Sequence, residues 1–374
     1  MAKPLLSVVV PTKDRYKYLK HLIKLIQSFN SDEIEIVVQD NTTDNKEILD
    51  FLSELNYSGC KYFHETGQLP MSTNADKAIL HSEGEYVCFL GDDDGVCPNA
   101  LDYCRYMKEH GYEALRSNVI AYNWPDCGGS IDNKVGVVYI KYSTMNEREI
   151  TSISELKDVF TRGFVDRGNL PSVYHGIVSR NTLNEIYSIS KTFFPGQSPD
   201  ISNGVAVSLV LDSYLYVDDI VTISGASKFH GGKTVGMKKQ YPQISDMVWF
   251  RPQAEELWDK RLPKIAVGYI IWAESTIETL KNMGRSDLIK SIDFEKVYKE
   301  FAVNYFPLKG MVYPLTTNFY SLFLYSYVFF IVRVGKAIIR RIRAAINKYP
   351  KGVSVISGII DINMCVDSLR TNVK

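Results

Sequence analysis

The sequence predicts an α/β protein: a Rossmann-like, mostly parallel sheet with helices on both faces, followed by a helical C-terminal region. Two observations lead to this class. In the first 110 residues, β-branched apolar runs alternate with longer segments whose apolar residues recur at helical spacing. The apolar runs are continuous, which is typical of strands buried on both faces. Repeated strand–helix units of this kind imply parallel strands joined by crossing helices.

Each expected element rests on such a pattern. The first strand is the apolar run from Leu5 to Val10, and the helix after it carries Leu19, Leu22 and Ile23 on one face. The first half gives strands 5–10, 34–39, 61–64 and 85–90 and helices 16–29, 45–55, 72–82 and 98–110. The pattern then loosens to strands 112–124, 135–142, 215–217 and 220–224 and helices 154–162, 181–190 and 200–211.

Composition excludes several classes of protein. The 374 residues include 43 Lys and Arg and 43 Asp and Glu, so the chain lacks the basic excess typical of a nucleic-acid binder. Six cysteines, none in a C-x-x-C pair, are typical of a reducing compartment and not of a zinc ribbon. The first residues lack the pattern of a signal peptide, so we expect a cytoplasmic protein.

The most prominent chemical feature is the acidic triplet Asp92, Asp93 and Asp94, directly after the strand at 85–90. Ligands of parallel α/β sheets bind at the carboxyl ends of the strands. Three adjacent carboxylates repel one another, and a hard divalent cation such as Mg²⁺ or Mn²⁺ would relieve that repulsion. The alternative is a solvated acidic turn that caps the helix at 98–110.

Two other strand ends carry polar residues. Asp40 and Asn41 end the second strand, and we expect them near the triplet, unless they form only an Asx turn. Asp14 and Arg15 follow the first strand, where they either contact a nucleotide or belong to a polar loop.

Three segments together resemble the family 2 glycosyltransferases of GT-A fold: SVVVPTKDRYKYL, IEIVVQDNTTDNKE and EGEYVCFLGDDDGVCPNAL. They follow the family's order and spacing over residues 5–100. The resemblance implies a GT-A catalytic domain that uses a nucleoside-diphosphate sugar, with UDP as the expected nucleotide. It also implies that Pro11, Thr12 and Asp40 hold the base and that the D-x-D acids bind the ribose and, through a metal, the diphosphate. The expected nucleotide-sugar-binding residues in this region are Pro11, Thr12, Asp14, Arg15, Asp40, Asn41, Asp92 and Asp93.

One position departs from the family pattern. When the chain is aligned on Phe89, Leu90 and Pro98, the first Asp of the motif falls on Gly91 and the second on Asp93. The motif could instead slide, so that Asp92 and Asp94 form the pair. We expect Asp93 and Asp94 to lie nearest to the metal, with Asp92 close behind.

An inverting transferase also needs a general base, because the acceptor hydroxyl must lose its proton as it attacks. The resemblance implies an acid that opens a helix well after the metal motif, and Asp200 fits this description. The alternatives are that Asp200 is a plain helix N-cap, or that Asp166, Asp218 or Asp219 is the base.

Three further residues are weaker candidates. His175, which follows a predicted strand, would line the acceptor side or serve packing alone. In the glycine-rich loop at 228–236, His230 and Lys233 would bring positive charge to the diphosphate, unless the loop is only a surface loop.

The C-terminal segment differs in character from the rest. Residues 319–332 are apolar and aromatic but shorter than the about 20 residues of a spanning helix. Basic residues follow, with Arg333, Lys336, Arg340 and Arg343 on one helical face. This pattern is typical of a helix lying in a membrane interface, and the alternative is packing on the catalytic domain or a dimer contact.

The sequence as a whole is interpreted as an inverting, metal-dependent glycosyltransferase of the hexosyl or N-acetylhexosaminyl type. We expect a GT-A domain over 1–236, a helical extension over 237–310 and a membrane-associating segment over 311–374, with membrane contact through 315–348. The expected acceptor is a glycan or a polyprenyl-diphosphate-linked glycan of surface polysaccharide assembly, at the inner face of the cell membrane. We expect no nucleic-acid partner, and a homo-oligomer stays open. The alternatives are a binding-only homologue and, less favoured, a sugar nucleotidyltransferase, whose glycine-rich segment after the first strand is replaced here by PTKDRY.

Overall fold

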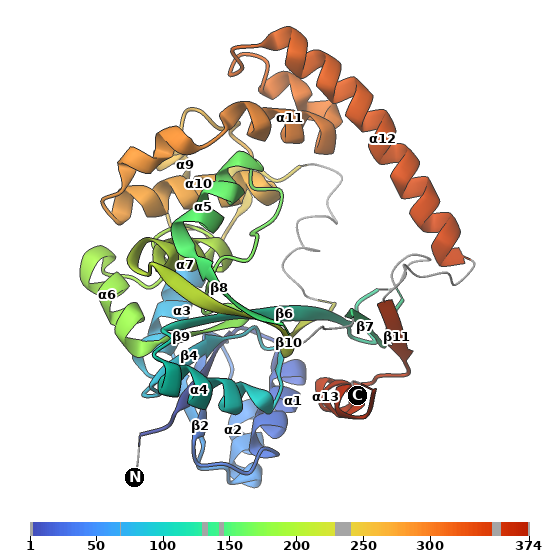
Figure 1. Cartoon of the computed structure of the whole chain (residues 1–374). Coiled ribbons are helices and arrows are strands. Elements are labelled where there is room, and N and C mark those ends of the chain that lie inside the picture. Colours follow the sequence, from blue (N-terminus) through green and yellow to red (C-terminus); the bar gives the residue numbers. More distant parts are fainter. Residues whose placement is uncertain are drawn as a thin grey trace.

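The computed structural model describes residues 3–67, 69–128, 134–141, 146–228, 241–345 and 353–372. A mixed sheet lies at the centre, helices cover both of its faces, and a helical region stands above one face (Figure 1). The strands are β1 (Leu6–Thr12), β2 (Ile34–Asp40), β3 (Cys60–His64), β4 (Tyr86–Phe89), β5 (Gly95–Val96), β6 (Ala114–Asn123), β7 (Val137–Lys141), β8 (Glu147–Thr151), β9 (Gly176–Ser179), β10 (Ser213–Ala226) and β11 (Val353–Ser357).

The helices differ widely in length. The α-helices are α1 (Tyr16–Gln27), α2 (Lys46–Leu55), α3 (Met71–Leu80), α4 (Asn99–His110), α5 (Ser152–Thr161), α6 (Arg180–Ser190), α7 (Pro199–Val210), α9 (Ala254–Leu257), α10 (Gly268–Asn282), α11 (Phe294–Asn304), α12 (Phe319–Ala345) and α13 (Ile362–Asn372). The 3₁₀ helices are η1 (Ile244–Asp246), η2 (Ser286–Ser291) and η3 (Phe306–Met311).

The first half of the chain forms the parallel part of the sheet, in the order β3-β2-β1-β4. Residues of β1 and β2 are almost all buried, as their continuous apolar runs predict. Side chains of α1, α2 and α4 pack on one face, and those of α3, α6 and α7 pack on the other. The α/β class and the GT-A-type arrangement of this half are therefore confirmed.

The second half extends the sheet with mixed strands. β9 pairs antiparallel with both β4 and β6, while the long strand β10 runs parallel to β6 and antiparallel to β5 and β8. The two strands predicted at 215–217 and 220–224 are one strand, because β10 continues through register shifts between Val217 and Thr222. The short strands β8, β9 and β11 were not predicted, since four or five residues give too little periodicity.

A second apolar core lies above the sheet. Side chains of α5 and α7 from the first domain join side chains of α10 and α11 around buried Trp258, Phe301 and Ile277. The helical extension is thus packed on the catalytic domain. The expected boundary between them, at residues 236 and 237, lies outside the described residues.

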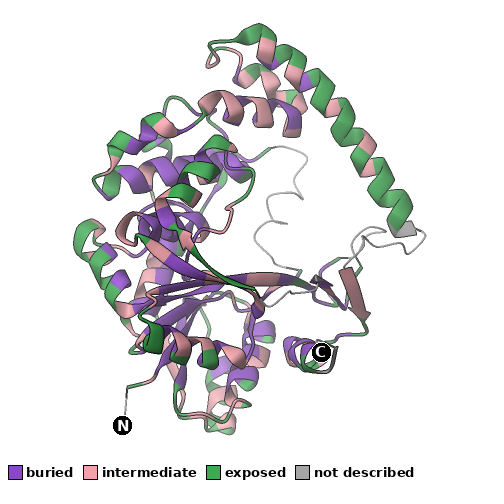
Figure 2. Cartoon of the chain, viewed as in Figure 1, coloured by how far each residue is buried: buried purple, intermediate pink, exposed green. Residues whose placement is uncertain are grey.

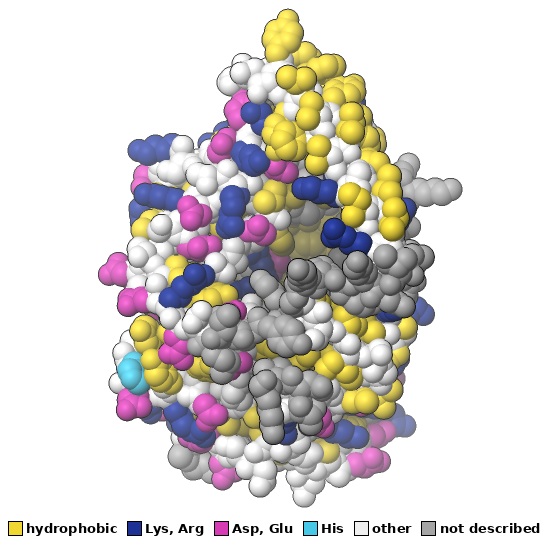
Figure 3. Space-filling view, turned by 45° about the vertical axis from the view of Figure 1, so that its right-hand side comes forward, with side chains coloured by type: hydrophobic (Ala, Val, Ile, Leu, Met, Phe, Trp, Pro, Cys, Tyr) yellow, Lys and Arg dark blue, Asp and Glu magenta, His cyan; other side chains and the backbone are white. Residues whose placement is uncertain are grey.

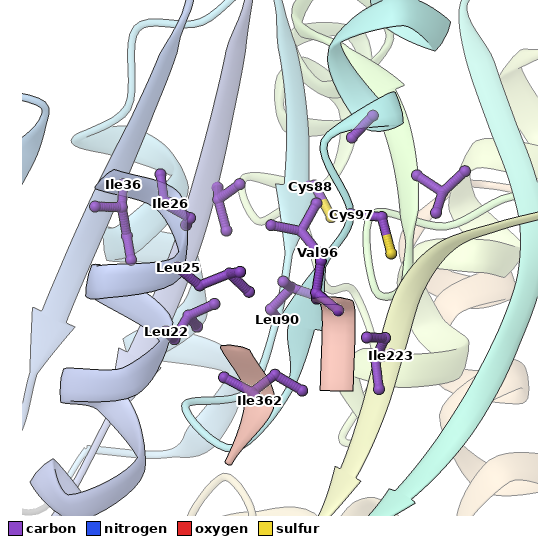
Figure 4. Close-up of a cluster of buried hydrophobic side chains, with 14 of the residues drawn as sticks. Leu22, Leu25, Ile26, Ile36, Cys88, Leu90, Val96, Cys97, Ile223 and Ile362 are labelled. Carbon is purple, nitrogen blue, oxygen red and sulfur yellow. The ribbon is translucent and has the colours of Figure 1, made fainter. Parts of the chain in front are cut away.

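The C-terminal segment divides into two parts, in contrast to the single segment expected over 311–374. α12 is largely exposed (Figure 2). β11 then pairs antiparallel with β7, and α13 packs against α1. Ile362 of α13 lies among Leu22, Leu90 and Val96 in the core of the first domain (Figure 4). The sequence pattern missed this return because β11 is short and α13 is a modestly apolar helix.

Candidate active site

The carboxyl ends of β1, β2 and β4 meet at one edge of the sheet. Thr12 of β1 pairs in register with Asp40 of β2, and the triplet follows β4 after Leu90 and Gly91. The Thr12 hydroxyl donates a hydrogen bond of 2.7 Å to Asp92 Oδ2 across this edge. Residues that the sequence singled out at three separate positions are thus brought together by the parallel register.

All three carboxylates of the triplet are buried, with 2–3% of each residue exposed. Arg15 contacts two of them, with Nε 3.0 Å from Asp92 Oδ1 and Nη2 2.6 Å from Asp93 Oδ2. Burial raises the pKa of Asp92 to about 7 and raises the pKa of Asp94 well above its usual range. One guanidinium therefore does not balance the negative charge of this cluster.

Asp94 is held differently from its neighbours. Its two oxygens accept hydrogen bonds of 2.8 Å from the backbone N–H groups of Gly91 and Gly225. His175 Nε2 lies 3.3 Å from Asp94 Oδ2, and the histidine itself is buried. His175 directly precedes β9 instead of following a strand, and its φ of 58° places it in the left-handed region. The structure thus brings the predicted acceptor-side histidine to the acidic triplet.

The end of β10 supplies site residues that the sequence analysis missed. Ser227 N–H donates to Asp93 Oδ2 at 3.2 Å, and the Trp124 indole donates to the Asp93 carbonyl at 2.9 Å. A Cβ on Gly225 would lie 1.7 Å from the Asp93 carbonyl oxygen, so only glycine fits there. The small-residue run Ser224–Ser227 is the signal that could have pointed to this close approach.

Asp40 and Asn41 anchor the loops around the second strand end. The hydroxyls of Tyr16 and Tyr62 each donate to Asp40 Oδ2 at 2.6 Å, and Thr42 N–H donates to Oδ1 at 2.8 Å. The last bond is the Asx-turn contact considered from the sequence. Asn41 donates to the Glu65 carbonyl at 2.6 Å.

A cavity of about 540 Å³ opens beside Arg15. Its lining includes Asp14, whose φ is 57° and whose N–H donates to Thr42 Oγ1 at 2.8 Å. The other lining residues are Arg15, Tyr16, Lys17, Tyr18, Thr42, Asp44, Glu47, Asp126 and Lys228. Pro11 stays in β1 and is absent from this lining. His230 and Lys233, predicted to reach the diphosphate, lie outside the described residues.

Asp200 lies in the first turn of α7 and is partly buried. Its Oδ2 accepts a 3.2 Å hydrogen bond from the Trp272 indole, its Oδ1 contacts the Ser198 hydroxyl, and its carbonyl accepts from Arg167 Nη1 at 3.0 Å. The N-cap position belongs to Ser198, so Asp200 is not the capping residue. Tyr174 has contacts toward both sites: Arg167, which donates to the Asp200 carbonyl, lies 5.3 Å from the centre of its ring, and the ring of His175, which contacts Asp94, lies 4.3 Å from it.

The other candidate bases are placed less favourably. Asp166 pairs with Arg162, Asp218 accepts from Asn118, and Asp219 accepts from Asn99 and Tyr103 beside α4. Asp200 is connected to Tyr174 through Arg167, which donates to its carbonyl and lies over the Tyr174 ring.

The carboxylate oxygens of the triplet are the kind of ligand that a divalent cation prefers. Among the described residues, no group of three or more His, Cys, Asp or Glu side chains is already arranged around a metal position. The chemistry nevertheless fits, because clustered carboxylate oxygens with one guanidinium leave negative charge that a hard cation would offset. Asp92 Oδ1 is also buried without a hydrogen-bond donor of good geometry.

These features are typical of one class of protein, an α/β protein of GT-A type whose acids lie together at the carboxyl ends of β1, β2 and β4. Residues 7–130 match the family model described as Glycosyl transferase family 2. The match explains why the sequence motifs and the edge of the sheet coincide.

Two curated relatives are similar to part of the chain. A GalNAc(5)-diNAcBac-PP-undecaprenol beta-1,3-glucosyltransferase of Campylobacter jejuni is 31% identical over 120 residues, covering 31% of this chain and 38% of that protein. WcaA of Escherichia coli, named as a glycosyl transferase, is 29% identical over 100 residues, covering 26% of this chain and 36% of that protein. The matches thus span less than half the length of each relative.

A solved structure is similar over a longer range. Crystalline S. aureus TarS 1–349 in complex with UDP-GlcNAc has a TM-score of 0.47 and 16% identity, covering 95% of this chain and 97% of that one.

Proposed function

We propose that this protein is an inverting glycosyltransferase that moves a sugar from a nucleoside-diphosphate donor, UDP by family resemblance, to a hydroxyl of a glycan acceptor. The observation that carries the proposal is the buried acidic triplet at the strand ends, held by Arg15, in a chain whose residues 7–130 match the family 2 model. The family match also disfavours the alternative of a sugar nucleotidyltransferase.

The donor side is formed by the strand ends. Asp40, Asn41 and Asp14 position the loops that would take the base and ribose, and the cavity beside Arg15 gives access to them. Arg15 would offset charge on the diphosphate.

A divalent cation, Mn²⁺ or Mg²⁺, would supply Lewis-acid stabilisation of the departing diphosphate. Asp93 is the second acid of the motif when the chain is aligned on Phe89, Leu90 and Pro98, and it is the first expected ligand. The contacts favour Asp92 as its companion, because Asp94 is already held by two backbone N–H groups and lies beside His175.

Asp200 is proposed as the general base. The acceptor oxygen forms a bond to the anomeric carbon, the bond from that carbon to the diphosphate oxygen breaks, and the nucleoside diphosphate leaves with the electron pair. The hydroxyl proton passes to Asp200, whose orientation is fixed by Trp272 and Ser198.

The acceptor is proposed to be a polyprenyl-diphosphate-linked glycan. The Campylobacter relative is named for an undecaprenol-linked acceptor. The exposed α12 supports a location at the inner face of a membrane, since it is the one helix in the described parts of the chain that is long and apolar enough to cross one. Hydrophobic side chains run along it in the space-filling view (Figure 3).

The test compares Asp200→Asn with Asp166→Asn, a nearby acid paired with Arg162 at the surface. Asn keeps the acceptor oxygen for Trp272, so the fold should persist. Loss of a general base costs about 10²- to 10⁴-fold in rate, and nucleotide affinity should stay near that of the wild type. Near-normal transfer by Asp200→Asn would remove it from this role. A wild type that binds UDP-sugars but never releases UDP would instead support the binding-only homologue.

A further inference from the structure

Three arginines gather on the face of the sheet that also carries Asp200's helix. Arg116 of β6 pairs in register with Tyr216 of β10, and Tyr216 pairs in register with Arg148 of β8. Paired residues project from the same side of a sheet. The Arg148 guanidinium lies 4.6 Å from the centre of the Tyr216 ring, so the three side chains form one row across the strands.

Arg167 joins this row from the loop after α5. Its guanidinium lies 5.3 Å from the centre of the Tyr174 ring and donates to the Asp200 carbonyl. Arg116 pairs in register with Gly176, two residues after Tyr174, and burial, followed by the charge of Arg167, lowers the pKa of Arg116 to about 10. We name Arg116, Arg148 and Arg167 the arginine cluster.

The cluster has no counter-charge. Within the described ranges, no ion pair joins any of its members to a carboxylate, although most other partly buried arginines have a clear partner. Arg180 is the useful contrast: it is also partly buried, but it donates to the carbonyls of Ile79 and Gly84 and to the Ser82 hydroxyl. Arg116 has no such acceptor among the described side chains and carbonyls.

The strand on the other side of Arg116 places no side chain beside it. Its register partner on β9 is Gly176, which has no side chain. A Cβ there would lie 2.3 Å from the Ser172 carbonyl, so the chain keeps glycine beside Arg116.

Two adjacent guanidinium groups, one partly buried and unpaired, are unfavourable in the free protein and favourable around an anion. We propose that Arg116 and Arg167, with Arg148 at the rim, form a phosphate-binding subsite beside the base Asp200. The proposal rests on the proposed function for the source of the phosphate. Arg167 donates a hydrogen bond to the carbonyl of the proposed base Asp200. The favoured source of the phosphate is therefore the diphosphate of a lipid-linked acceptor, and the alternative source is the diphosphate of the donor.

The first test uses inorganic pyrophosphate and the full chain, with EDTA present so that no metal site contributes. Binding is measured by calorimetry for wild type, Arg116→Met, Arg167→Met and the control Arg180→Met. Methionine keeps the apolar stem and removes the charge. We expect affinity to fall about 10- to 100-fold in the two cluster variants and to stay unchanged in Arg180→Met, since hydrogen bonds to charged groups have such strengths. Unchanged affinity in both cluster variants would overturn the subsite.

Melting temperatures give a second readout. Arg116→Met should melt at or above the wild-type temperature, because a partly buried cation beside another cation is removed, whereas Arg180→Met should melt lower, because three acceptors lose their donor. An Arg116→Met variant that melts lower and binds pyrophosphate normally would assign Arg116 a structural role.

Kinetics distinguish the sources of the phosphate. A raised KM for a polyprenyl-diphosphate acceptor, with an unchanged KM for donor hydrolysis, assigns the subsite to the acceptor, and the reverse assigns it to the donor. Pyrophosphate binding needs no turnover. If the wild type transfers no sugar, while Arg116→Met still binds pyrophosphate more weakly than the wild type, the proposed function is contradicted and the subsite is supported.

Discussion

The contact between Ile362 and Gly95 allows a sharp test of how the C-terminus contributes to the catalytic domain. Ile362 is fully buried, and a Cβ at Gly95 would lie 2.5 Å from its Cγ1. Replacing a buried Ile by Ala costs about 2–5 kcal/mol. With an unfolding entropy of roughly 0.8 kcal/mol/K for a chain of this length, a loss of about 3 kcal/mol lowers Tm by about 4 °C. The matched control is Ile360→Ala, because Ile360 is 67% exposed and should change Tm by less than about 1 °C.

The same pair predicts a coupling of defined sign. Gly95→Ala alone should destabilise by about 1–3 kcal/mol, since its methyl group meets Ile362. In the double variant Gly95→Ala/Ile362→Ala the clash is absent, so the total loss should be smaller than the sum of the single losses. Circular dichroism melts of the four proteins measure this cycle. Strict additivity, or an Ile362→Ala variant that melts with the wild type, would refute the docking of α13 on β5.

Three further outcomes are expected. Deleting residues 353–374 should abolish soluble folding, because burial of five residues from 359 to 369 contributes roughly 10 kcal/mol to the free energy of unfolding. This is comparable to the whole stability of a domain, so a cooperative melt at the wild-type Tm would contradict the expectation. Asp93→Asn should lose most donor turnover while keeping its Tm, and wild-type activity should fall in EDTA and return with Mn²⁺; equal rates in EDTA and Mn²⁺ would exclude the metal. Burial raises the pKa of Glu274 from 4.5 to about 7, so its favourable contribution is present below pH 4.5 and lost as pH rises through 7. The unfolding free energy of Glu274→Gln minus that of wild type should therefore grow from pH 5 to pH 8, by up to about 3 kcal/mol, and a flat difference would contradict the buried carboxyl.

The parallel half of the fold was predictable because its information is local. Continuous apolar runs mark β1, β2 and β4, and the acids at their ends occupy one sheet edge by the geometry of parallel strands. The sequence alone therefore predicts that Asp40 lies close to the triplet. Asp200 was singled out by the family resemblance, which implies an acid at the start of a helix, and the Ser-Pro-Asp sequence begins such a helix by local rules.

The remaining contacts depend on pairings that are distant in sequence. Gly225 and Ser227 reach the triplet only because β10 runs parallel to β6 across more than 90 residues of chain. Arg15 could be predicted as a strand-end residue, but its bridge between Asp92 and Asp93 follows from the loop conformation that begins at Asp14. No local pattern predicts that β11 joins the sheet, since the strand has only five residues.

The way α12 is fixed at both ends decides how it can meet a membrane. In its first half, Tyr325 donates to Glu300 at 2.9 Å, and at its middle Arg333 donates to the Asn304 carbonyl at 2.7 Å, while beyond its end β11 pairs with β7. A helix of 27 residues is about 40 Å long, and residues 346–352 reach at most about 25 Å. If α12 crossed a hydrocarbon core of about 30 Å, β11 could not return to a sheet on the first side. The helix therefore suits the plane of the surface.

In-plane binding predicts a specific liposome result. The full chain should sediment with anionic vesicles at low salt and be released at high salt, because each Lys or Arg near such a surface adds about 1 kcal/mol that salt screens. The variant Lys336→Gln/Arg341→Gln/Arg343→Gln should bind much more weakly. The control Lys24→Gln/Lys46→Gln/Lys108→Gln, with the same charge change on α1, α2 and α4 across the sheet, should bind normally (Figure 1). Equal binding by both triple variants, or a full chain that stays in the supernatant at low salt, would show that α12 packs on protein and not on lipid.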